Sequence, residues 1–131
     1  MKAVYRTIFL ATVILAVACH KDNVTETSIT GKWKLTEVLA DPGDGSGKFN
    51  PVAPKADYDY VKFELNGKLE GTVLSDYVRY SIKDSVITVF KTDNTLQNYQ
   101  YKIHDGVMDM SPAGPLFCIE GCANRFVKVS N

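Results

Sequence analysis

The 131-residue sequence is short of the side chains from which most catalytic and metal sites are built. It contains two His, three Cys and one Trp. Only His104 falls in the part with the pattern of a folded domain, and no Ser-His-Asp, Cys-His or paired-carboxylate arrangement accompanies it. We therefore expect no enzyme activity, no bound metal and no cofactor.

Charge of one sign and long apolar runs are scarce as well. Lys and Arg together number 15, as do Asp and Glu, and no basic face suggests nucleic acid as a partner. The one apolar run, residues 8–17, is about half of the roughly 20 residues that a membrane-spanning helix needs. Because it follows Lys2 and Arg6, it has the form of a secretory signal, in which a short positive segment precedes the apolar one.

Ala16-Val17-Ala18-Cys19 stands at the end of this run. The segment resembles the lipobox of bacterial lipoproteins in a relaxed form, since Ala16 stands where Leu is usual. The resemblance implies that residues 1–18 are a signal peptide and that Cys19 carries a lipid, which holds the protein because each buried CH2 contributes about 0.8 kcal/mol. We expect a membrane-anchored protein of the cell envelope, in the outer membrane. The alternatives are a transmembrane anchor and a cleaved signal with an incidental cysteine.

Cys118 and Cys122 remain as a pair. An oxidising compartment favours a disulfide between them, although so small a loop limits the entropic stabilisation. Free thiols and a metal-binding pair are the alternatives, and a metal would need further ligands nearby.

From Ile29 onward, apolar and polar residues alternate with the period of two that is typical of strands. Residues 20–28 are polar and without period, so we expect a flexible tether there. Asn66-Gly67 and Asp105-Gly106 are hairpin signals, and no stretch has a helical period over three turns. Residues 29–131 are thus predicted to form one all-β domain, an antiparallel up-and-down meander of about eight strands that closes into a barrel and protects its edges. Apolar positions of the alternation include Trp33, Leu35, Val61, Phe63, Leu65, Val78, Tyr80, Ile82, Tyr99, Tyr101 and Ile103.

Two segments rich in Gly and Pro interrupt the alternation, residues 41–54 and residues 111–122. Asp41 and Asp44 lie in the first, but their spacing differs from that of an EF-hand calcium loop. We expect two surface loops, of which the second is braced by the two cysteines.

The first strand opens with Gly31-Lys32-Trp33, which resembles the Gly-x-Trp signature of lipocalins. In that family an Arg near the last strand places its guanidinium over the Trp, and Arg125 is the matching residue. The resemblance implies that Gly31, Trp33 and Arg125 close a lipocalin-like barrel, with a cation–π contact of about 0.5–2 kcal/mol. The chain is also similar to the small lipocalin-like lipoproteins of Gram-negative bacteria, in its lipobox, its loop 41–47 and its final residues 118–129.

This resemblance suggests a monomeric module that binds a small hydrophobic ligand. Glu37 lies on the apolar face of the first strand and points inward if that strand is regular, whereas a bulge or an early end would turn it to solvent. Tyr80, Tyr99 and Tyr101 suit a ligand cavity, because each joins an apolar ring to a polar group, and they also suit ordinary packing. The alternative function is a solidly packed barrel that binds another envelope protein or a glycan with its surface. An interior void well above about 300 Å3 would favour the ligand.

Overall fold

The computed structural model describes residues 28–131, and within these residues the chain forms nine strands and no helix. The strands are β1 (Gly31–Ala40), β2 (Phe49–Pro51), β3 (Tyr60–Phe63), β4 (Leu69–Gly71), β5 (Arg79–Lys83), β6 (Val86–Phe90), β7 (Leu96–His104), β8 (Val107–Gly114) and β9 (Cys122–Ser130). The predicted all-β class is confirmed. None of these described residues belongs to a helix that could cross a membrane. The expected signal peptide, the lipid on Cys19 and residues 20–27 of the tether lie outside the described residues.

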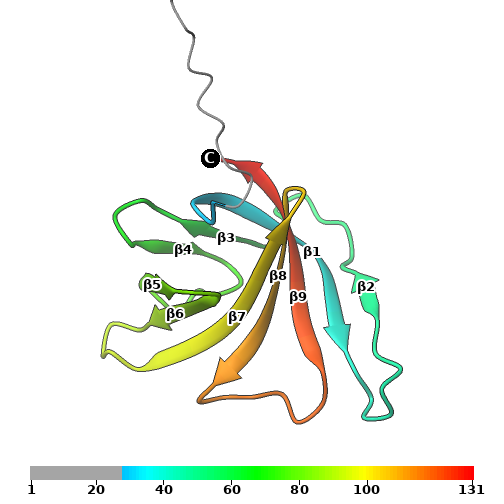
Figure 1. Ribbon diagram of the computed structural model, residues 1–131. Helices are drawn as coiled ribbons and strands as arrows, with labels where there is room; N and C mark the ends of the chain where they lie inside the picture. Colours follow the sequence, from blue (N-terminus) through cyan, green and yellow to red (C-terminus); the bar gives the residue numbers. More distant parts are fainter. Residues whose placement is uncertain (1–27) are drawn as a thin grey trace, which may run out of the picture.

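One sheet, with the strand order β4-β3-β1-β9-β8-β7-β6-β5, curls into a nearly closed barrel, and β2 pairs with β1 beside it (Figure 1). All strand pairs are antiparallel. Asp84 and Asp105 take positive φ angles of 54° and 50° in the tight turns after β5 and β7, where Asp is tolerated in the left-handed region. β1 pairs with β9, so the first and last strands meet, as the predicted closed meander requires.

A narrow seam joins β4 to β5, where the barrel nearly closes. Lys68 and Arg79 form an isolated bridge. The Leu69 N–H donates to the Val78 carbonyl at 3.0 Å, and the Tyr80 N–H donates to the Gly67 carbonyl at 2.8 Å. These bonds cover the short edges that would otherwise expose unpaired backbone groups.

The strand boundaries differ from the predicted ones in two loops and at one hairpin. β2 lies inside residues 41–54, and β8 extends to Gly114, inside the second predicted loop. Leu65 was expected to continue the apolar face of its strand. It is instead 92% exposed, because β3 ends at Phe63 and the chain already enters the Asn66-Gly67 turn.

Side chains from almost every strand fill the barrel. The inward positions alternate along the strands, as at Val61 and Phe63 or Met108 and Met110. The Trp33 Nε1–H donates to the Ile29 carbonyl at 2.6 Å, which satisfies its one polar atom inside an apolar core. The largest fully buried side chains are Trp33, Phe63, Phe126, Ile87, Met108, Val61 and Val89.

Candidate functional site

The three tyrosines predicted to line a ligand cavity are part of the packed wall. The Tyr80 hydroxyl donates to the Glu64 carbonyl at 2.7 Å, and its ring packs edge-on against Phe63 with centroids 4.9 Å apart. Tyr99 and Tyr101 also pack against the core. Burial raises the pKa of Tyr80 and of Tyr99. The hollow beside Tyr99 has a volume of about 140 Å3, whereas small-molecule pockets usually measure about 300–1,000 Å3.

Glu37 does not point into the barrel. The β1–β9 register shifts between Leu35 and Glu37, so Thr36 is the extra residue of a β-bulge, and the bulge reverses which side chains face inward. Glu37 stands opposite Arg125. Because Phe126 is buried, its neighbour Arg125 lies on the outer face. Of the two predicted orientations of Glu37, the structure has the one in which a bulge turns it to the outer face.

Arg125 holds a cluster on the outer face of β1, β9 and β8. Its Nε and second terminal nitrogen contact the two oxygens of Asp109 at 2.7 and 3.1 Å, and its other nitrogen contacts Glu37 at 3.1 Å. These hydrogen bonds, with Asp109 first, raise the pKa of Arg125. The guanidinium also stacks 3.7 Å from the centroid of the Phe49 ring. Every charge here has a partner, so the cluster ties strands together and offers no free group for chemistry.

The prediction that Arg125 covers Trp33 is wrong. Trp33 pairs with Lys128 across the sheet, and the Lys128 Nζ lies 5.4 Å from the Trp33 ring. Arg125 stands opposite Glu37 instead, four residues further along β1, a distance of about 13 Å. Gly31 does mark the meeting of the two ends, since a Cβ there would collide with the Ser130 carbonyl.

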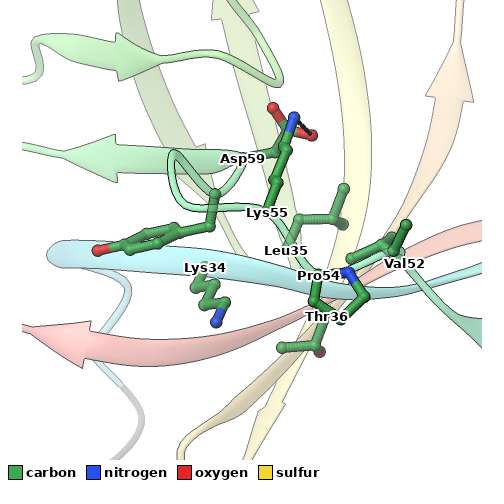
Figure 2. Close-up of a pocket in the computed structure, with 9 residues that line it drawn as sticks. Lys34, Leu35, Thr36, Val52, Pro54, Lys55 and Asp59 are labelled. Carbon is green, nitrogen blue, oxygen red and sulfur yellow. Dashed lines mark ion pairs between the residues drawn. The ribbon is translucent and has the colours of Figure 1, made fainter.

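A half-enclosed hollow interrupts the wall where β1 changes partners, and we call it the notch (residues 34–36, 52–55, 58 and 59; Figure 2). β1 pairs with β3 up to Lys34 and with β2 from Glu37, and the chain between β2 and β3 spans the gap. The Leu35 N–H donates to the Asp59 carbonyl at 2.8 Å, and the Val52 N–H donates to the Thr36 carbonyl at 2.9 Å. The notch has a volume of about 190 Å3, which is below the usual range for small ligands.

The charged groups of the notch sit at its edge. Lys55 and Asp59 form an ion pair of 2.7 Å, which Figure 2 shows beside the start of β3. The Lys34 Nζ lies 5.1 Å from the Tyr58 ring and has no acidic partner within residues 28–131. The notch thus combines an apolar lining with one unpaired cation.

Residues 115–121, which we call the tip, join β8 to β9 at one end of the barrel (Figure 1). The predicted disulfide between Cys118 and Cys122 is confirmed. Gln97 is 2% exposed and holds the tip from the barrel side. Its amide donates to the Leu116 carbonyl at 2.8 Å and accepts from the Leu116 N–H at 3.0 Å. Both backbone groups of Leu116 are therefore satisfied by one side chain, as in a strand pair.

The tip carries large apolar side chains in solvent. Leu116 is 71% exposed, Phe117 is 69% exposed and Ile119 is fully exposed. The Phe117 ring leans on Gly114, where a Cβ would approach its edge to 2.7 Å. The sequence reasoning missed these residues because Pro and Gly mark the segment as a loop. The available signal was three bulky apolar residues around a C-x3-C pair.

The loop after β1 packs beside the tip and is organised by Asp41. Its carboxylate accepts from the backbone N–H groups of Gly43, Gly45 and Gly47 at 2.8, 3.1 and 3.0 Å, and its own N–H donates to the Gly121 carbonyl at 2.8 Å. The hydrogen bonds from Gly43 and Gly47 are the main causes that lower the pKa of Asp41. Within residues 28–131 no group of His, Cys, Asp or Glu has the arrangement of a metal site.

Replacing Asp41 with Ala should lower stability at neutral pH and have a diminishing effect in acid. The folded-state pKa of Asp41 is lowered, so its contribution is present above the unfolded-state pKa and is lost as the pH falls through the folded value. Urea unfolding of both proteins between pH 7 and pH 2 should give stabilities that converge below the unfolded-state pKa of 3.8. A constant difference over this range would contradict the role given to the ionised carboxylate.

Comparison with protein-family models, curated protein sequences and solved structures found no match.

Proposed function

We propose that this chain is a lipid-anchored lipoprotein of the cell envelope, of the lipocalin-like kind, whose packed barrel presents the tip to another protein. The observation that carries the proposed protein contact is the tip itself, where Leu116, Phe117 and Ile119 are held in solvent. Exposed apolar groups that gather at one place are typical of interaction sites. The hydrogen bonds between Gln97 and Leu116 and the disulfide hold the tip in one shape. A loop that is preorganised in this way loses less conformational entropy when it docks.

The packed core argues against the alternative that the barrel binds a small ligand in its interior. Trp33, Phe63 and Phe126 occupy the space that a ligand would need. Tyr80, Tyr99 and Tyr101 pack against the core cluster to which these residues belong. The bulge at Thr36 also takes the carboxylate of Glu37 away from the interior. A solid barrel of this kind acts through its surface.

The position of the tip favours a protein partner over the anchoring membrane. The chain enters the barrel at Ser28, whose carbonyl accepts from Lys128 near the end of β9. The tip lies at the other end of β1, about 30 Å away along a strand of ten residues. The expected tether 20–28 spans at most about 30 Å when fully extended, so it would have to be stretched for the tip to reach the bilayer. Acidic groups beside the tip, Asp41 and Glu120, would also be repelled by anionic lipids.

A photoreactive group at the tip tests the proposed contact. With p-benzoylphenylalanine in place of Phe117 in the full chain, irradiation of cells should yield a discrete protein adduct, because the ring would lie against the partner. The matched control places the same group at Leu65, which is more exposed but lies in the β3–β4 hairpin at the anchor end, and it should yield none. Adducts only to lipid, or equal adducts from both positions, would rule out the tip as a protein contact.

Replacing Cys19 with Ser should abolish incorporation of a labelled fatty acid, since the thiol is the expected attachment point. The Cys118→Ser/Cys122→Ser double variant is the control and should still take up label. Metabolic labelling followed by immunoprecipitation measures both. Label retained in Cys19→Ser would refute the proposed anchor.

A further inference from the structure

We infer that the partner of the tip is a second copy of this chain, whose notch receives the tip's apolar side chains. This inference rests on the proposed function, in which the tip binds a protein. It deepens that proposal by naming the partner and the surface that the partner offers.

The size of the notch suits a side chain better than a free ligand. Its volume of about 190 Å3 is below the range of small-molecule pockets. Leu35, Val52 and Pro54 give it an apolar lining. An aromatic or branched side chain such as Phe117 or Ile119, presented on a braced loop, matches both properties.

The charges of the two surfaces are complementary. Glu120 is exposed on the tip with its carboxylate beside Gly43, and it has no cationic partner within residues 28–131. Lys34 at the notch likewise has no acidic partner there. Asp41 adds negative charge beside the tip, while Lys32, which lies 5.0 Å from the Tyr58 ring, adds positive charge beside the notch. Docking a tip into a notch would pair Glu120 with Lys34, and complementary charges of this kind favour one orientation and discourage wrong partners. A tip-to-tip contact would instead bring the acidic groups of two copies together.

The two surfaces lie at different places on the barrel. The notch opens beside the middle of β1, and the tip lies past the Ala40–Cys122 end of the β1–β9 pair. A copy that offers its tip therefore keeps its own notch free. Such a head-to-tail contact between copies need not form a closed ring, so it can extend into rows of copies. The contact is small, and anchoring the copies in one membrane would raise their effective concentration.

The test uses the full chain with p-benzoylphenylalanine in place of Phe117, irradiated in cells. We expect an adduct with the mass of two chains, in which the cross-linked peptide contains residues 34–36 or 52–59. Glu120→Lys and Lys34→Glu should each lower the yield of this adduct about tenfold, because like charges would then face each other. The chain with both substitutions should regain the wild-type yield, since the pair is restored with its signs exchanged. Both side chains are partly or fully exposed, so the fold should tolerate the changes.

Each outcome of this test decides between the two proposals. A two-chain adduct at the notch, weakened by either reversal and restored by both, supports the inference. A two-chain adduct elsewhere on the surface, or no rescue in the double variant, overturns the notch as the receptor. An adduct with a different protein overturns the second-copy inference and leaves the proposed function standing. The absence of any protein adduct overturns both.

Discussion

Replacing Trp33 with Ala is expected to destabilise the domain by about 3–5 kcal/mol. Trp33 is fully buried beside Phe63 and Phe126 in the core, and its removal leaves a cavity that the strands on either side cannot fill. The variant also loses the hydrogen bond from the indole to Ile29, which fixes the chain just before β1. Urea unfolding followed by circular dichroism measures the change in the free energy of unfolding.

Leu65→Ala provides the matched control for this loss. Leu65, like Trp33, is a large residue at an apolar position of the alternation in the sequence, but it is exposed. Its replacement should therefore change stability by less than about 0.5 kcal/mol. A loss of similar size at both positions would contradict the packed core described here. A small loss at both positions would instead favour a ligand cavity, because the interior would then be loosely filled.

Replacing Gln97 with Glu should cost about 3 kcal/mol at neutral pH, since a buried hydrogen-bond donor is exchanged for a charged acceptor. The Gln97 amide nitrogen donates to the carbonyls of Asn98 and Leu116, and the introduced carboxylate would face both oxygens. Burial and these carbonyls would raise the pKa of the introduced carboxyl. Its protonated form restores a donor, so the cost should shrink as the pH falls through this raised pKa. Denaturant unfolding between pH 8 and pH 4 measures the trend.

Gln100→Glu is the control for that experiment, because Gln100 lies on the same strand with its side chain exposed. It should be nearly neutral over the whole pH range. The two substitutions also separate stability from binding. If the hydrogen bonds between Gln97 and Leu116 preorganise the tip, the Gln97 variant should give a lower yield of the Phe117 cross-link at temperatures where its barrel is still folded. An unchanged yield would show that the disulfide alone sets the shape of the tip.

Much of the fold could be predicted because local signals agreed with each other. Val61 and Phe63 alternate with polar residues and lead into Asn66-Gly67, and the structure has a hairpin there. The C-x3-C pair could be predicted as a disulfide because the expected compartment is oxidising and favours pairing of the two remaining cysteines. Such features depend on neighbours in the sequence, where the period of the strand and the chemistry of the turn act directly.

The candidate site was harder to predict, because it depends on which strands meet. The bulge at Thr36 reverses the facing of Glu37, and no residue near it marks an interruption of the strand. Lys128 replaces Arg125 over Trp33 because the β1–β9 register sets which residues stand opposite. The exposure of Phe117 depends on Gln97, which is 20 positions away in the sequence and meets the tip only after β7, β8 and β9 have paired.

The sequence by itself determined the all-β fold class of this protein. A period of two, frequent tight turns and the lack of a helical period leave few ways to bury the apolar face other than a closed antiparallel sheet. Only the tertiary structure decided that the barrel is solid and where its surface is exposed and apolar. The physical reason is that interior volume, strand register and the notch follow from packing between residues far apart in the chain. Those contacts exist only once the first and last strands are side by side.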